Sequence, residues 1–415
     1  MLLILGVPVA FSLGLSSIAT MLYLDIPPVV AFQRMAAGMN VFALMAIPFF
    51  IYSGELMNQS GIAERLVRFA HSLLARVRGG LGLVDVASSM MFGAISGSAV
   101  ASASAMGSAL IPIMKKEGYD ADYAVSVTVT AATTGLLIPP SHNMIIYAIA
   151  AGGGISIGSL FLAGIVPGIL LGAGLMLVTY LVAIKRGYPS GHFPGWGQVL
   201  RYFAAALPGL FSALIILGGI LSGIFTATES SAIAVIYTIF VAVVLYRSLD
   251  WNGFVTASIN AVKTTAMVLL IIGTASAFGW LLAVTEVPAQ LSSALLAISD
   301  NPLVILLIVN LILLILGTFM DMSPLIIITT PIFLPVMMGI GMDPVQFGIM
   351  LILNLGMGVV TPPVGSVLFV GCAIGGIRIE DTLRAIWPFY LAFLIMLAFV
   401  TYVPATTLFL PAFFS

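Results

Sequence analysis

The clearest indication of chemistry in this 415-residue chain comes from two pairs of consecutive prolines, Pro139-Pro140 and Pro362-Pro363, which lie 223 positions apart. Consecutive prolines remove two amide donors and force the preceding residue away from helical geometry, so nearby carbonyl oxygens lose their intrahelical partners. Hard cations such as sodium prefer oxygen ligands of this kind. Each pair therefore predicts an interrupted helix whose free carbonyl groups can bind a cation.

Upstream of each proline pair lies a long apolar run that is broken near its middle. The first run, 82–114, is interrupted at SGSAVASAS (96–104), and the second, 303–337, is interrupted at MDMSP (320–324). Each run is longer than the ~20 residues of one bilayer crossing. Backbone that leaves the helix at that depth is tolerated only where protein or a water-filled cavity satisfies it. Both runs therefore predict re-entrant hairpins whose tips line a cavity.

These four breaks define the candidate ligands of two sodium ions, one in each half of the chain. Paired breaks in repeated halves are typical of a transporter site near the bilayer midplane. The alternative is that they are kinks and small-residue packing faces, which are common in membrane helices. The candidate ligands of the first ion are Ser96, Gly97, Ser98, Gly135 and Ile138, and those of the second ion are Gly317, Thr318, Asp321, Gly358 and Thr361.

The same segments supply the candidate substrate-binding residues, which are Ser98, Ser102, Ser141, Asn143, Ser323, Pro362 and Val364. Asp321 is the only acidic side chain in either tip, and it could ligate sodium, cap the following half-helix or relay a proton. His142 is interpreted as a polar residue at the cavity edge rather than as a proton carrier. No Lys or Arg lies at any break, so an anionic substrate would need bound cations and half-helix amino termini. Ion coupling would then be obligatory for binding.

The composition places the chain in a membrane and excludes several classes of protein. With 61% hydrophobic and only 7% charged residues, the chain has too few charges for a soluble surface. A net charge of -1 leaves no electrostatic footprint for nucleic acid. The single Cys372 excludes an internal disulfide framework and a cysteine-based metal site. Because HExxH, GxSxG and P-loop motifs are absent, we expect no enzyme and no cofactor, with sodium only as a coupling ion.

The distribution of apolar residues predicts an all-α integral membrane protein. The proline pairs interrupt two of its crossings, 123–149 and 345–371, and the polar stretch 185–206 is the predicted cytoplasmic connector between halves 1–184 and 207–415. The amphipathic stretch 61–80 is expected in the inner interface, as an arm that clamps a moving hairpin or as a plain linker. Full crossings are expected at 1–24, 40–60, 123–149, 159–184, 207–226, 229–246, 266–285, 345–371 and 386–410.

The two halves are predicted to be inverted repeats. Matching residues such as Asp120 and Asp343 lie 223 positions apart, as do the two proline pairs. Six of the 14 Lys and Arg fall between Arg65 and Lys116, whereas the matching window 288–341 has none. The positive-inside rule then places the first hairpin on the cytoplasmic side and the second on the outer side, with the amino terminus inside and the carboxyl terminus outside.

A few charged residues are expected elsewhere. Arg34 is alone on a predicted outer loop and is the one misfit to the positive-inside rule. Four acidic residues lie near predicted span ends and are expected to be solvated or interfacial: Glu55, Asp85, Glu229 and Glu286.

Five segments together resemble the large membrane subunit of the TRAP (tripartite ATP-independent periplasmic) transporters, over essentially the whole chain. The resemblance implies a bacterial inner-membrane importer of organic acids that is driven by a sodium gradient. It also implies an elevator mechanism, in which hairpins and broken helices move as a transport domain against a scaffold. The segments are LMAIPFFIYSGELM (44–57), SGSAVASASAMG (96–107), GLLIPPS (135–141), FMDMSP (319–324) and TPPVG (361–365).

The resemblance further implies two partners, a small four-helix membrane subunit and a periplasmic substrate-binding protein. The chain has no segment matching the small subunit, which is therefore expected as a separate polypeptide. Family substrates include C4-dicarboxylates, sialic acid, other sugar acids and keto acids, and a sugar acid is favoured slightly because one carboxylate needs less positive charge. Two other functions stay open: a stand-alone divalent-anion/sodium symporter and a non-transporting membrane scaffold subunit.

Overall fold

The computed structural model describes residues 2, 7–299 and 301–414, and these fold into helices apart from one isolated β-bridge between Arg78 and Ser190. Within this described part, seven helices are long and apolar enough to cross a membrane. The number rises to eight if the bent pair Val29–Met39 and Phe42–Gln59 is one span. The prediction of an all-α integral membrane protein is confirmed.

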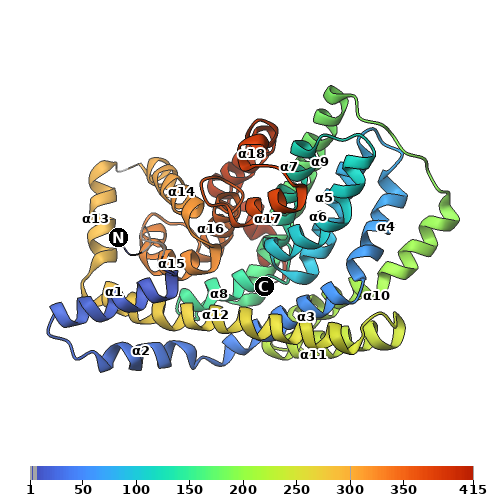
Figure 1. Ribbon diagram of the computed structural model, residues 1–415. Helices are drawn as coiled ribbons and strands as arrows, with labels where there is room; N and C mark the ends of the chain where they lie inside the picture. Colours follow the sequence, from blue (N-terminus) through green and yellow to red (C-terminus); the bar gives the residue numbers. More distant parts are fainter. Residues whose placement is uncertain (1, 3–6, 300, 415) are drawn as a thin grey trace.

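Two helical hairpins lie on opposite sides of the molecule (Figure 1). The first consists of α5 (Gly80–Ser96) and α6 (Ala99–Lys116), and the second consists of α14 (Pro302–Phe319) and α15 (Met322–Gly339). Each tip is only two residues long, so both breaks are shorter than predicted. The reason is that Ser98 in the first tip already occupies the N-cap position of the second helix, as its counterpart does in the other hairpin.

Each proline pair interrupts a helix, so the two discontinuous helices of the predicted fold are present. The first is α7 (Ala121–Ala132) with the 3-10 turn η2 (Thr133–Leu136), followed after the prolines by α8 (His142–Ala150). The second is α16 (Pro344–Gly358), followed by α17 (Ser366–Gly375). Both diproline bonds are cis. All residues of α7 from Tyr123 onward and of α16 from Gln346 onward are buried, as expected for helices that are apolar on every side.

A layer of long helices lies below the hairpins in the view of Figure 1. The longest, α12 (Trp251–Val284), packs against α1 (Val9–Tyr23), α2 (Val29–Met39) and α3 (Ala46–Gln59). A 3-10 turn, η1 (Phe42–Met45), joins α2 to α3. This layer also contains α11 (Ala227–Phe240), which continues as the π turn η3 (Val241–Leu245). Helix α10 (Trp196–Leu221) packs against α11 and lies at the right of the view.

Short helices at opposite ends of the molecule accompany the hairpins. In Figure 1, α4 (Ile62–Leu74) lies toward the right and α13 (Val287–Ile298) lies at the left. α4 packs between α5 and α10, and α13 packs between α12 and α15. The long helices α9 (Ile157–Arg186) and α18 (Ile379–Tyr402) pack against each other, and the final helix α19 (Ala405–Phe414) packs on α9.

Several boundaries differ from the predictions. α10 begins at Trp196, so the stretch between α9 and α10 is 187–195 rather than 185–206. The predicted last crossing, 386–410, contains two helices because α18 ends at Tyr402 before Pro404. Helices α2 and α13 are missing from the predicted spans because their 11 and 12 residues are too few for a full crossing. The predicted first crossing, 1–24, includes residues 1 and 3–6, which lie outside the described residues.

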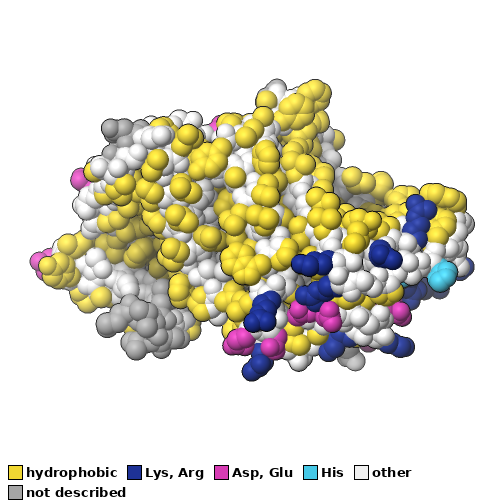
Figure 2. Space-filling model, turned by 90° about the horizontal axis from the view of Figure 1, so that it is seen from above, with side chains coloured by type: hydrophobic (Ala, Val, Ile, Leu, Met, Phe, Trp, Pro, Cys, Tyr) yellow, Lys and Arg dark blue, Asp and Glu magenta, His cyan; other side chains and the backbone are white. Residues whose placement is uncertain are grey.

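Basic side chains gather toward one end of the molecule. Figure 2 shows them toward the right of this face, the end at which α4 and α10 lie in Figure 1, and none at its left end. Arg186 pairs there with Asp120 at 2.9 Å and with Asp122 at 2.8 Å. A hydrogen bond from Tyr188 and the nearby Arg186 guanidinium hold the pKa of Asp120 below its usual range. This is the end that the positive-inside rule would place in the cytoplasm.

Two of the isolated charges are not where the sequence predicts them. Arg34 lies on α2 rather than on a loop, and its guanidinium carbon is 4.8 Å from the ring centroid of Trp280. This cation-π contact accounts for a lone arginine at that position. Asp85 is fully buried on α5 rather than interfacial, because α5 is enclosed by other helices over its whole length. Glu229 is exposed and completes a capping box with Thr226 at the start of α11.

Candidate functional site

A pair of glycines brings each hairpin against its broken helix. A Cβ atom added to Gly135 would lie 2.4 Å from the Cα atom of Gly93, so η2 and α5 touch through their backbones. In the second repeat, a Cβ atom on Gly358 would lie 2.6 Å from the Cα atom of Gly317, which joins α16 to α14. Small residues permit such close approach of membrane helices. The candidate ligands Gly135, Gly317 and Gly358 thus lie at the two crossings next to the tips.

The first tip rests on the break in the first broken helix. Gly97 has a φ of 63°, in the left-handed region that favours glycine, and a Cβ atom there would lie 2.8 Å from the carbonyl oxygen of Pro140. Ser98 caps α6, because its hydroxyl accepts a hydrogen bond from the Ala101 amide at 3.3 Å. The tip and the proline break therefore bring hydroxyl and carbonyl oxygens into one small region.

Three buried hydroxyl groups near this tip have no hydrogen-bond partner in the described part of the chain. They belong to Ser96, Ser102 and Ser141, of which Ser96 is 6% exposed and the other two are fully buried. A buried polar group without a partner costs about 1–3 kcal/mol, and native proteins normally satisfy it with a ligand, an ion or water. These oxygens fit the ligand chemistry of a hard cation. By contrast, the side chain of Ile138 packs against Gly168 of α9.

The second tip carries the acid. Asp321 occupies the N-cap position of α15 but makes no capping hydrogen bond, so capping is not the role that the structure gives it. Instead the Ser366 hydroxyl donates to Asp321 Oδ1 at 3.2 Å, which links the tip to α17. The tip is also bonded to the proline break, because the Val364 amide donates to the Thr318 carbonyl at 3.1 Å. Since that amide is used, it is not a free donor for a substrate.

Thr361 is half-buried just after the end of α16 and lines neither of the cavities described below. Its hydroxyl donates to the Met357 carbonyl at 2.7 Å, and this leaves its oxygen lone pairs available.

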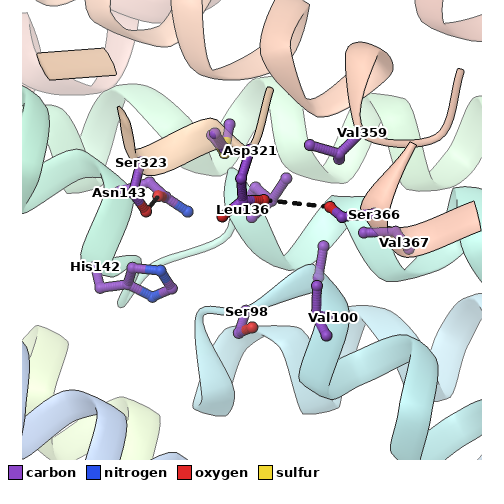
Figure 3. A pocket seen from close by; sticks show the side chains of 12 residues that line it. Ser98, Val100, Leu136, His142, Asn143, Asp321, Ser323, Val359, Ser366 and Val367 are labelled. Carbon is purple, nitrogen blue, oxygen red and sulfur yellow. Dashed lines mark hydrogen bonds between the residues drawn. The ribbon is translucent and has the colours of Figure 1, made fainter. Parts of the chain in front are cut away.

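The two tips meet at one small pocket, which Figure 3 shows with both tips and both broken helices around it. The Ser323 hydroxyl from the second repeat donates to Asn143 Oδ1 from the first at 3.3 Å. This bond leaves the amide hydrogens of Asn143 available to a ligand. The pocket has a volume of about 60 Å³, and His142 stands at its edge as the sequence predicts.

A larger cavity of about 530 Å³ separates the tips from the lower helix layer. Its size is within the ~300–1,000 Å³ of small-molecule sites. The wall on the tip side includes Ser96, Ser98, His142, Asp321 and Ser323. The opposite wall, which we call the scaffold wall, is formed by residues of α3 and α12, and these are Ile51, Gly54, Glu55, Asn58, Asn260, Thr264, Met267, Val268 and Ile271.

A cavity between paired tips and interrupted helices is typical of secondary transporters. The profile of the family described as "Tripartite ATP-independent periplasmic transporter, DctM component" matches residues 1–406. The chain belongs to the DctM family. This confirms the resemblance noted from the sequence segments, and it identifies a component of a transporter rather than an enzyme.

Relatives along the whole chain agree with this assignment. The chain is 39% identical over 414 residues to the sialic acid TRAP transporter large permease protein SiaM of Vibrio cholerae, covering 100% of this chain and 95% of that protein. It is 40% identical over 401 residues to the C4-dicarboxylate TRAP transporter large permease protein DctM of Pseudomonas aeruginosa, covering 96% and 93%. Among solved structures, the YdaH transporter of Alcanivorax borkumensis is similar with a TM-score of 0.61 and 14% identity, covering 89% and 87%. At that identity, the likeness is one of fold alone.

The scaffold wall of this DctM-family chain is what the sequence reasoning missed. Glu55 lines the cavity instead of facing the interface, and the Asn260 side-chain amide donates to its Oε2 at 3.5 Å. A signal was present, because Asn260 and Thr264 are one helical turn apart within a long apolar helix and so share a face. Four predicted substrate residues line neither cavity: Ser102, Ser141, Pro362 and Val364.

The charge of the two cavities is one-sided. Glu55 and Asp321 are acidic, and no Lys or Arg is among the residues that line either cavity. An acidic ligand entering this space would meet carboxylates without a compensating Lys or Arg. Cations bound beside the tips would remove that repulsion.

Proposed function

We propose that this DctM-family chain is the large membrane subunit of a sodium-coupled importer of an organic acid in the bacterial inner membrane. The observation that carries the proposal is the cavity between the tips and the scaffold wall, which offers many oxygen atoms and no Lys or Arg among its lining residues. Such a site accepts an acid only together with cations. The relatives named for sialic acid and for C4-dicarboxylates support an organic acid as the substrate class.

Two sodium ions are proposed, one at each crossing of a hairpin with its broken helix. In the first site the unpartnered hydroxyls of Ser96 and Ser141 lie near the oxygen-rich contact of Gly97 with Pro140. In the second site Asp321 supplies a carboxylate that is exposed to the cavity and held by Ser366. Oxygen ligands of this number and type suit sodium better than a transition metal.

The mechanism proposed is an elevator movement, because the two walls of the cavity belong to different sets of helices. The tips and broken helices would move as a transport domain against the layer that contains α3 and α12. The end at which basic residues gather would be cytoplasmic, and the opposite end, toward which α1 and α13 lie in Figure 1, would be periplasmic. A substrate held at the tips would then be exposed first to one side of the membrane and later to the other.

Two partner proteins are proposed: a small four-helix membrane subunit and a periplasmic substrate-binding protein. The description of the matching family as tripartite supports a complex of several components. The substrate is proposed to be a sugar acid such as sialic acid rather than a C4-dicarboxylate. Amide and hydroxyl groups of Asn58, Asn260 and Thr264 can bond to substrate hydroxyl groups, and one carboxylate needs fewer cations than two.

Uptake into liposomes tests the proposal. Vesicles holding this chain with its small subunit should accumulate a labelled sugar acid only with an inward sodium gradient and an added binding protein. Transport without either partner would instead support a stand-alone divalent-anion symporter. If Asp321→Asn and Ser98→Ala both leave that uptake unchanged, the chain is a scaffold subunit and not the permease.

A further inference from the structure

One buried acid has no place in the proposed transport site. Asp85 lies on α5 inside the first hairpin, is fully buried, and lines neither of the two cavities. Its partners are hydroxyl groups: Ser89 at 3.3 Å from Oδ1, and Thr128 of α7 in close contact with Oδ2. No salt bridge to Asp85 occurs within the described residues. The titratable neighbour is Tyr123 of α7, whose hydroxyl donates to the Thr179 carbonyl at 3.0 Å.

Counting hydrogens shows which form of Asp85 this arrangement satisfies. The Thr128 hydroxyl has one hydrogen but two acceptor oxygens within reach, Asp85 Oδ2 and the Ala124 carbonyl at 2.9 Å. If Asp85 is the neutral acid, its own hydrogen goes to Thr128 Oγ1, and the Thr128 hydrogen goes to Ala124. If Asp85 is ionised, Thr128 must give up one of its two bonds, and a buried charge is left with no cation to balance it.

The second repeat has a neutral bridge within about one helical turn of the corresponding place. Asn310 lies seven residues before the crossing glycine Gly317, as Asp85 lies eight residues before Gly93. The Asn354 side-chain amide donates to the backbone oxygen and to Oδ1 of Asn310, both at 2.9 Å. These amides join α14 to α16 as Asp85 and Thr128 join α5 to α7. A side chain that forms hydrogen bonds without carrying a charge thus joins the hairpin to its broken helix in the second repeat.

From this geometry we infer that Asp85 is a proton-binding site, whose carboxyl group is held as the neutral acid and donates its hydrogen to Thr128. The proton comes from water as the hairpin packs, and it remains with the protein. The bond positions α5 against α7 without burying a charge. This inference does not depend on sodium coupling or on the identity of the transported acid.

Infrared difference spectroscopy of the full chain in lipid vesicles tests the protonation directly. Asp85→Asn should remove a carbonyl band of a protonated carboxylic acid, and that band should shift in deuterated water. Asp381→Asn is the matched control, because Asp381 is exposed and paired with Arg378 at 3.3 Å, so it should remove bands of an ionised carboxylate. If Asp85→Asn also removes ionised-carboxylate bands and leaves the acid region unchanged, the inference is wrong.

Variants of the acceptor test where the hydrogen goes. Thr128→Val keeps the shape but removes the oxygen, so the acid band should remain and move to the position of a weaker hydrogen bond. Thr128→Ser should leave it near its original position. If Thr128→Val leaves the band unmoved, Asp85 does not donate to Thr128. In uptake assays Asp85→Asn should stay within about two-fold of the wild type, since an amide can donate and accept at the same two places, whereas Asp85→Ala should lose most uptake.

Discussion

The two halves of this DctM-family chain share a backbone arrangement but differ in the polar groups attached to it. Both have a hairpin that crosses a broken helix at a glycine pair, and both broken helices contain a cis diproline bond. The first half joins hairpin to helix with Asp85 and Thr128 and has only hydroxyls at its tip. The second half uses two asparagines for the same connection and places Asp321 at its tip.

The difference shows that geometry and charge are separable in this fold. Glycine and proline act on the backbone, and they are what the two halves keep in register at 223 positions. Asp120 and Asp343 are kept as well, but the polar side chains at the tips and in the bridges have diverged around that frame. The predictions that follow change one half at a time and compare it with the other.

The largest effect is expected from filling a glycine crossing. Gly135→Ala and Gly358→Ala each place a methyl group against backbone atoms, at 2.4 and 2.6 Å, where no side chain can move aside. We expect a loss of about 3 kcal/mol or more in stability and no measurable uptake, with the first half affected more. Thermal unfolding of the purified variants measures this. Gly218→Ala on α10 is the control, because open space surrounds that glycine; equal melting temperatures for all three variants would contradict the crossing geometry.

The second-largest effect is expected on the sodium concentration that uptake requires, and variants of the two tips are compared to test it. Asp321→Asn should raise the sodium concentration for half-maximal uptake by at least ten-fold, about 1.4 kcal/mol of binding free energy, because a charged ligand is lost. Ser96→Ala removes one neutral oxygen and should raise it less. Since the Ser96 hydroxyl has no partner within the described residues, its removal should also slightly stabilise the sodium-free protein. A larger sodium effect at Ser96 than at Asp321 would reverse the proposed division between the tips.

A smaller effect is expected from the asparagine bridge of the second half. Asn354→Ala removes both bonds to Asn310 and leaves the buried Asn310 Oδ1 without that donor, but it also removes Asn354 Oδ1, which has no partner within the described residues, so it should cost about 1 kcal/mol. The melting temperature of the variant in detergent reports this loss. Ser88→Ala on α5 is the comparison, since that buried hydroxyl has no partner within the described chain and its removal should change little.

The smallest effect is expected on the melting temperature in acid, and variants of Asp120 and its counterpart Asp343 are compared to test it. The hydrogen bond from Tyr188 and the nearby Arg186 lower the pKa of Asp120 in the folded protein. They therefore stabilise the folded protein above the unfolded-state pKa of about 4, and this stabilisation is lost as the pH falls through the lower folded-state pKa. The Asp120 side chain is 60% exposed, so the contribution is only a few tenths of a kcal/mol. Asp120→Asn should reduce the loss of melting temperature in acid. Asp343→Asn should not, since asparagine replaces aspartate at the N-cap of α16.

The hairpins and broken helices could be predicted because their causes are local. A proline pair removes amide donors at its own position, and Gly97 permits a tight tip, whatever the rest of the chain does. The same local reasoning selects Ser96, Gly97 and Ser98 as the first-half candidates, which stay predictions. Short helices such as α13 were missed because a hydropathy rule for full crossings passes over them.

The scaffold wall and the buried acid could not be found from local patterns. Glu55 and Asn260 meet from positions 205 residues apart, and nothing near either one indicates the other. Asp85 lies near the start of a hairpin helix, where the sequence suggests an interfacial position. Its burial follows from the packing of α4, α7 and α9 around α5, which only the tertiary structure determines.

The corner between α4 and α5 is closed by residues that follow much later in the chain. The Gly79 amide donates to the Pro189 carbonyl at 3.1 Å, and the Gly191 amide donates to the Ala75 carbonyl at 2.8 Å. On the ribosome, those partners emerge only after the whole first hairpin and its broken helix have been made. Until then the corner has open backbone groups that water must satisfy. The corner can therefore close only when translation has passed beyond the first half, which ties its closure to the synthesis of the stretch 187–195.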